Sequence, residues 1–337
     1  MRFEVRGFNP KLETGLIMEL LRTVHNRGYP QEYLQARIRG RRAYQIGDWE
    51  RILSAADPLE AVPASPYRGA LTVRSEEEVW QNLLRELVWL YCQMDQRVRE
   101  IFSPVFVCFE LRTLVLCLRN KGERNDRKIE ELLFYSLLAG KVQKALKADQ
   151  DLPGVIDAVA GVLSAGAMRF GRLRNIYREQ GLTGFEQGLT NLSLGEVIKG
   201  PLHPLIREFI SRLIDTRNVM TLYKHLRWRI KAPPAFIEGG GIRESALREI
   251  AEKNDMAEVS PLIRRLTGEE VEAASAGNVE RLLLTAITRL VRRRGREPAG
   301  TGLILDHLWR CYVEALNLSL LIHCRDDREA VRRELVQ

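Results

Sequence analysis

Apolar residues recur along most of this chain at steps of three and four, which is the spacing of one face of an α-helix. The clearest case starts with Ser75-Glu76-Glu77-Glu78, a Ser-x-x-Glu capping box that places negative charge at the positive helix end. Apolar residues then repeat at helical spacing as far as Ile101. The pattern predicts a helix over 75–102, ended by Pro104 because the residue before a proline avoids helical angles.

The same periodicity predicts six more helices, separated by segments rich in glycine and proline. They are expected over 127–147, 155–180, 204–230, 242–254, 279–294 and 303–324. Strand signals are weak: the first residues alternate and 105–109 is a short apolar run, but neither has a partner run with hairpin chemistry. We therefore expect an all-α fold.

The chain also shows a weak three-fold repeat. Three longer apolar helices carry an acid followed three residues later by Thr or Asn, and the acids Glu110, Asp215 and Glu314 lie 105 and 99 residues apart. Each copy opens with an Asp and then a Val, with the aspartates at Asp57, Asp151 and Asp255. A period near 100 is a normal domain size. It predicts three similar helical domains, over 1–125, 126–232 and 233–337.

Composition limits the possible classes of protein. The apolar fraction of 45% is that of a globular chain, which excludes disorder and collagen-like structure. The net charge is +8, because 52 lysines and arginines outnumber 44 aspartates and glutamates, and 42 of the basic residues are arginines. This excess is spread along the chain, so a polybasic tail is not expected, and an acidic partner is the question it raises.

Membrane, export and metal signals are weak. Charged residues at Arg2, Glu4 and Arg6 interrupt the start of the sequence, so we expect no export signal. The most membrane-like run, 158–168, has eleven residues where a spanning helix needs about 20, so we expect no direct membrane span. The five cysteines form no CxxC motif and the five histidines are scattered, so no metal and no cofactor is expected.

Enzyme signatures are also missing from the sequence. It contains no GxxxxGK[ST] phosphate loop and no GxSxG motif, and Gly239-Gly240-Gly241 is interpreted as a flexible entry to a helix. We interpret the acids Glu110, Asp215 and Glu314 as hydrogen-bonded or ion-paired between helices, not as a catalytic cluster. We expect no catalytic residue and no small-molecule substrate.

Two arginine clusters are the candidate partner-binding residues. The first comprises Arg37, Arg39, Arg41 and Arg42, and the second comprises Arg292, Arg293, Arg294 and Arg296. Two alternatives remain open, a solvated helix face and a docking surface for an acidic protein, since arginine serves interfaces well. A nucleic-acid surface would combine such groups with stacking aromatics, and only Tyr44 and Trp49 lie near the first cluster.

Several segments, taken in order along the chain, carry a resemblance to a known family. They are Tyr33-Leu34-Gln35-Ala36-Arg37-Ile38-Arg39-Gly40 (Y-x-x-A-R-[VI]-R), 49–71, 110–121, 236–247, Asn317-Leu318 and 325–335. Together they resemble the C-subunit family of the archaeal and bacterial V-type ATPases, whose eukaryotic counterpart is the d subunit. Thr113 and Ser319 depart from the pattern of this family, which has Asn and Arg at these places.

The resemblance implies a pseudo-three-fold funnel of helical domains without an active site of its own. It implies a peripheral adapter on the cytoplasmic face of a membrane, with the proteolipid ring and the central stalk as partners and no nucleic acid. Such an adapter couples ATP turnover to proton or sodium transport. Two rival hypotheses remain: an arginine-rich helical scaffold that binds nucleic acid, and an enzyme with an unrecognised site in a helical domain.

Overall fold

The computed structural model describes residues 19–62, 75–270, 276–297, 300–324 and 327–337. Within these ranges the chain forms α-helices and two short 3₁₀ turns without a strand, which confirms the all-α prediction. The first six residues, on which the missing export signal was predicted, and part of the resembling 49–71 stretch lie outside the described ranges. Two compact units are formed, one by 1–27 with 96–210 and the other by 28–95 with 211–337.

The first unit is a cluster of helices around aromatic side chains. Phe102, Phe106, Phe170 and Phe185 are fully buried in it. Its helices are α5 (Gln96–Gly122), α6 (Asp126–Phe134), α7 (Gly140–Leu146), α8 (Leu152–Gly166), the 3₁₀ turn η1 (Met168–Arg172) and α9 (Leu173–Lys199). The predicted helices over 127–147 and 155–180 are thus each interrupted, by residues 135–139 and by η1.

The predicted end of a helix at Pro104 is wrong, because Pro104 lies inside α5 and is buried. A proline in a helix interior removes one amide donor, and the apolar packing around it must outweigh that loss. Val105, Phe106 and Val107, the run that looked strand-like, are all 0% exposed on the same helix. Burial on every side explains why this run forms a continuous apolar stretch in the sequence.

The helix predicted over 75–102 breaks ten residues before the proline. The second unit's α4 (Glu76–Gln93) ends at Met94, whose backbone is extended. Tyr29 accounts for the break: its amide donates to the Gln93 carbonyl at 2.8 Å, and its carbonyl accepts from the Asp95 amide at 3.1 Å. At Gly28, which has φ +62, a side chain would collide with the Met94 carbonyl, so glycine is required for this close approach.

One described helix is long and apolar enough to cross a membrane by length and composition alone. This helix is α5 and not the 158–168 run, which is the most membrane-like part of the sequence but was expected to be too short to span. Inside the protein, 72% of the most apolar stretch of α5 is buried. Core helices of other proteins pass the same test, so the observation is weak evidence for a membrane span.

The second unit contains ten helical elements in its described residues, one of them shared with the first unit. α10 (Pro204–Arg227) begins in the first unit and continues into the second. The others are α2 (Gln31–Arg42), α3 (Trp49–Ser54), α4, α11 (Glu244–Lys253), η2 (Met256–Glu258), α12 (Val259–Thr267), α13 (Ala276–Gly295), α14 (Thr301–His323) and α15 (Arg328–Glu334).

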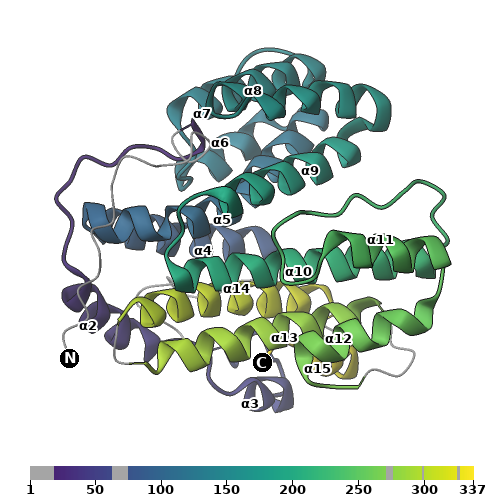
Figure 1. Cartoon of the computed structure of the whole chain (residues 1–337). Coiled ribbons are helices and arrows are strands. Elements are labelled where there is room, and N and C mark those ends of the chain that lie inside the picture. The colour runs from purple at the N-terminus through teal and green to yellow at the C-terminus, as the bar shows by residue number, and fades with distance from the viewer. Residues whose placement is uncertain (1–18, 63–74, 271–275, 298–299, 325–326) are drawn as a thin grey trace, which may run out of the picture. The chain divides into compact units, whose positions relative to one another are not determined.

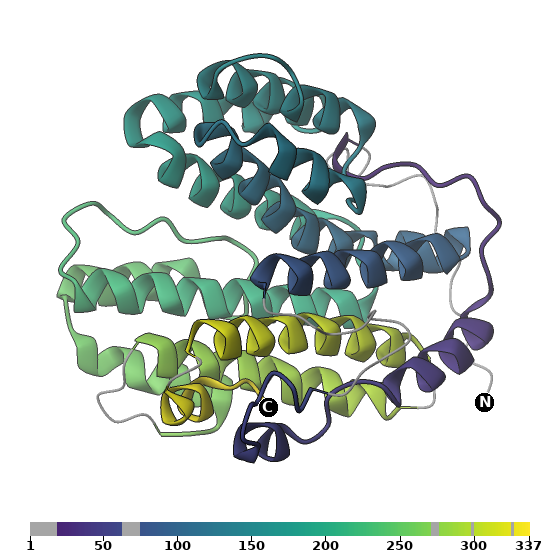
Figure 2. The same ribbon diagram turned by 180° about the vertical axis from the view of Figure 1, so that it is seen from behind.

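Two packing centres hold the second unit together. α10, α11, α12 and α13 share one core, which includes Val219, Leu222 and Leu247. α14 lies along α13, and Figures 1 and 2 show these two helices side by side from both directions. α2 and α4 also pack on α14. The buried Trp309 anchors this side, where its indole donates to the Thr288 hydroxyl of α13 at 2.9 Å.

Each of the three repeat acids accepts a hydrogen bond from a loop amide, which confirms their predicted structural interpretation. Glu110 accepts from the Leu137 amide at 2.8 Å and from the Ser136 hydroxyl at 2.7 Å. Asp215 accepts from the Ile242 amide at 2.9 Å. The spacing between acid and amide is 27 residues in both cases. Glu314 accepts from the Ile46 amide at 2.8 Å, which comes from a distant part of the chain.

The asparagines three residues after the second and third acids form a second clamp. Asn218 donates to the Ile237 carbonyl and accepts from the Ile237 amide, both at 2.8 Å. Asn317 binds Val336 in the same way, at 2.8 and 3.0 Å. The spacing is 19 residues in both. In the first copy Thr113 cannot make this double bond, and its hydroxyl bonds Glu110 instead.

The helices that carry the first two acids also end alike. Fourteen residues after each acid, Arg124 and Arg229 have left-handed backbones, with φ 56 and 50. At both ends the next amide reaches back five residues and the arginine amide reaches back three, which is a Schellman motif. These equal spacings support the repeat at the level of local geometry, while the three-domain division stays a prediction.

We expect the Asn218→Ala variant to lose about 2–4 kcal/mol of unfolding free energy. The change removes two hydrogen bonds and leaves both polar groups of the buried Ile237 backbone without a partner. Urea unfolding of full-length variants measures this. Arg217→Ala is the matched control, because Arg217 is the exposed neighbour of Asn218. Equal stability of the two variants would contradict the clamp.

Candidate functional site

Both predicted arginine clusters lie in the second unit, on helices that contact α14. The first occupies α2, with Arg41 and Arg42 in its last turn, and the second ends α13. A positive charge would be disfavoured at a helix N-terminus, but both clusters lie at C-termini, where the helix dipole favours cations. The eight side chains do not form one free surface, because several are engaged in the fold.

Arg42 is bound to a buried carboxylate on a neighbouring helix. Its guanidinium forms an ion pair with Asp306 of α14, whose side chain is only 2% exposed. Arg310 lies one turn along α14 and donates to both oxygens of Asp306, at 3.1 and 3.2 Å. Burial lowers the pKa of Arg42, the charge of Asp306 raises it, and the charge of Arg310 lowers it again.

Arg292 brings the second cluster to the same carboxylate. Burial lowers the pKa of its guanidinium, Arg310 lowers it further, Asp306 raises it, and Arg296 again lowers it. Its Nε atom is buried and has no hydrogen-bond partner among the described residues. Gly295 lies between Arg292 and Arg296 in the sequence and faces Asp306 so closely that a side chain there would meet the carboxylate.

The result is a site with more positive than negative charge, which we call the Asp306 site: Asp306 with Arg42, Arg292, Arg296 and Arg310. The guanidinium groups of Arg42, Arg292 and Arg310 interact with one carboxylate, and the charge of Arg296 acts on Arg292. Arg296 is exposed, and Arg42, Arg292 and Arg310 are partly so. Guanidinium groups bind carboxylates with two parallel hydrogen bonds. The site is therefore able to accept a further acidic group from outside.

The other arginines of α2 form different contacts. Arg41 pairs with Glu86 of α4 and lies over the ring of Trp89, with its guanidinium carbon 3.4 Å from the ring centroid. Arg37 lies 5.6 Å from the same ring and donates to the Tyr33 hydroxyl at 2.9 Å. These contacts fasten α2 to α4 by ion pairing and cation–π attraction. Arg41 thus belongs to the fold.

The remaining predicted arginines do not join the Asp306 site. Arg39 is exposed on α2. Arg293 lines a separate cavity of about 290 Å³ between α10, α12 and α13. Arg294 pairs with Glu297 at 2.9 Å.

The structure therefore brings together only three of the eight predicted residues, Arg42, Arg292 and Arg296. It adds Asp306 and Arg310, which the sequence-based prediction did not include. Their four-residue spacing, which places an acid and an arginine on the same helix face, was the signal available for them.

A second buried network lies beside the site. His307 of α14 contacts Glu86 through Nε2 at 3.0 Å, and its Nδ1 lies 3.4 Å from the Gln45 amide nitrogen. The Cys311 sulfur is 3.8 Å from Nε2. Burial would lower the pKa of His307, but Cys311 and the Glu86 carboxylate outweigh it and raise the pKa to about 9. Glu86 therefore holds Arg41 and a protonated His307 together.

The described residues contain no group of three or more potential metal ligands from His, Cys, Asp and Glu. The repeat acids Glu110 and Asp215 are committed to loop amides, and burial raises the pKa of both carboxyl groups. What the geometry supports is electrostatic binding of an acidic group.

Comparison with known proteins points to a single family. Residues 50–333 match the family described as ATP synthase (C/AC39) subunit. Two curated relatives, each named as the C subunit of a V-type ATP synthase and each from a strain of Thermus thermophilus, are 28% identical over 312 residues. The alignment covers 86% of this chain and 92% of each relative.

The raised pKa of His307 predicts a pH-dependent stability. An imidazole with pKa 6.5 in the unfolded chain and about 9 in the fold stabilises fully below pH 6.5 and loses that effect as pH rises through 9. The loss is on the order of 3 kcal/mol. Urea unfolding between about pH 6 and 10 measures it, and the His307→Gln variant should show a flatter profile.

Cys311 contacts the same imidazole and is one of the groups that raise its pKa. The Cys311→Ser variant is therefore the control, and it should keep the part of the slope that comes from Glu86. A slope that persists unchanged in His307→Gln would refute the prediction.

Proposed function

The chain belongs to the ATP synthase (C/AC39) subunit family, because residues 50–333 match that family. From this premise we propose that the chain is the central-rotor adapter of a V-type rotary ATPase or ATP synthase. Its partners are the central-stalk subunits and the membrane proteolipid ring. It couples ATP turnover to proton or sodium transport without an active site or cofactor of its own. It works as a peripheral protein at the cytoplasmic face of the membrane.

The family match over most of the chain carries this proposal. The relatives' name, which makes each the C subunit of a V-type ATP synthase, supports a role within such a complex. The architecture suits an adapter that transmits torque, because α5 has 27 residues and α10 and α14 have 24 and 23. Long helices with buried faces are stiff elements. Three domains around an axis, supported by the repeated clamp spacings, would supply the opening for a stalk.

Within this function, the Asp306 site is the proposed docking point for an acidic group of a partner protein. Arg292 and Arg296 are the residues to test, because the side chain of neither forms a hydrogen bond or ion pair to another described residue. The sequence alone would suggest replacing each whole cluster with alanine and expecting the fold to stay intact. The structure changes that design, since Arg41 and Arg42 pair with Glu86 and Asp306 and their loss would weaken the fold itself.

The Arg292→Ala, Arg296→Ala double variant should bind its rotor partners about tenfold more weakly, because charge-assisted hydrogen bonds to a partner carboxylate are lost. Pull-down of purified central-stalk subunits and of proteolipid ring in detergent measures the two contacts separately. The difference in affinity between the double variant and the unmodified chain should shrink at high salt, where exposed charges are screened.

The matched control is Arg294→Ala, which removes a neighbouring arginine that is paired with Glu297. It should bind like the unmodified chain. If the unmodified chain associates with neither the stalk nor the ring, the adapter function is contradicted. Normal association with no effect of the double variant would contradict only the docking role of the Asp306 site.

A further inference from the structure

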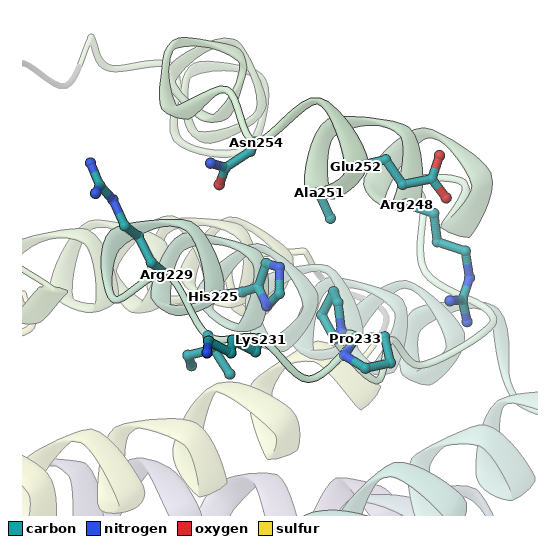
Figure 3. Close-up of a pocket in the computed structure, with 10 residues that line it drawn as sticks. His225, Arg229, Lys231, Pro233, Arg248, Ala251, Glu252 and Asn254 are labelled. Atoms are coloured by element: carbon teal, nitrogen blue, oxygen red, sulfur yellow. The ribbon is translucent and has the colours of Figure 1, made fainter.

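A groove lies at the C-terminal end of α10. The side chains that line it are different from those of the Asp306 site. The groove has a volume of about 400 Å³ and is formed by the end of α10, the segment 229–234 and α11. Figure 3 shows His225, Arg229 and Lys231 on one side and Arg248, Ala251 and Glu252 on the other. This volume falls within the roughly 300–1,000 Å³ of typical ligand sites.

Positive charge dominates the lining of the groove. Arg229, Lys231 and Arg248 contribute three cations against the single carboxylate of Glu252. Arg248 is balanced by Glu244 on its own helix, whereas the side chains of Arg229 and Lys231 form no hydrogen bond or ion pair to another described residue. The ring of His225 adds a buried Nδ1 atom without a hydrogen-bond partner in the described part of the chain. An anionic group would complete these unmet contacts.

Apolar surface lies next to the charges. Ile230, Pro233, Pro234 and Ala251 also line the groove. Ile230 is 44% exposed and the neighbouring Trp228 is 59% exposed, which is unusual for side chains of this size. A simple phosphate would use only the cations. A segment with both acidic and apolar side chains would use the whole lining.

Arg229 is held in a strained conformation at this groove. It occupies the left-handed position of the Schellman motif that ends α10, where glycine is the favoured residue because it has no Cβ. Strained residues that persist often serve a function. Arg124, at the same place in the motif that ends α5, carries equal strain on an exposed helix end and provides a natural comparison.

From these observations we propose that this groove binds an acidic segment of a partner protein, with Arg229 and Lys231 contacting its carboxylates and Ile230 and Pro233 contacting an apolar side chain. A membrane surface fits this groove less well, because a nearly flat bilayer makes little contact with a concave lining. The groove shares no residue with the Asp306 site, so this proposal stands apart from the proposed adapter function.

Titration of the full-length chain against a fluorescein-labelled peptide of alternating glutamate and leucine tests the proposal by fluorescence anisotropy. The unmodified chain should bind it saturably, and the same peptide with glutamine in place of glutamate should bind at least about tenfold more weakly. Arg229→Gly should weaken binding by about tenfold, since one charge-assisted contact is lost. Absence of saturable binding would overturn the proposal.

Arg124→Gly is the matched control. Both glycine variants relieve the same backbone strain, so both should unfold at or above the temperature of the unmodified chain. Only Arg229→Gly should lose peptide affinity. Equal losses in the two variants would overturn the assignment to this groove. So would tighter binding of tripolyphosphate than of the peptide, or binding to phosphatidylserine vesicles without binding to the peptide.

Discussion

A carboxylate inside a packed helical unit must find hydrogen-bond donors, and this requirement organises the protein. Glu110 is fully buried and Asp215 nearly so, and each is satisfied by the amide of a loop that lies 27 residues further along the chain. An unsatisfied buried carboxylate would cost several kcal/mol, so the loop has one permitted position. The same acid therefore fixes where the loop returns to its helix and where the next helix starts.

The third acid shows what this constraint does to distant parts of the chain. Glu314 takes its amide from Ile46, which lies between α2 and α3, and not from a following loop. Arg42, four residues earlier, is held by Asp306 on the same helix as Glu314. Two carboxylates of α14 thus attach the end of α2, and with it the first arginine cluster. The charge-rich site exists because a structural clamp and an ion pair converge on one helix.

Local patterns in the sequence were enough to predict the helices but not their interruptions. The apolar rhythm runs unbroken through Met94, and only Tyr29 and Gly28, more than sixty residues away, convert that point to extended chain. Pro104 was expected to end a helix because its local preference is clear, yet surrounding apolar contacts keep it inside α5. The repeat acids were interpreted correctly, because their spacing is visible in the sequence. Their loop partners at 27 residues were not predicted.

The arginine clusters show the same division between composition and geometry. The sequence presents the eight arginines as two clusters, but adjacent side chains on a helix point in different directions. Arg41 turns to Trp89 and Glu86, Arg42 to Asp306, and Arg294 to Glu297. Charge that is paired within the fold cannot also bind a partner without a cost. The arginines that the fold leaves without a hydrogen bond or ion pair among the described residues, as at Arg292 and Arg229, are therefore the ones we propose for partner binding, and they can be identified only once the neighbouring acids have been placed.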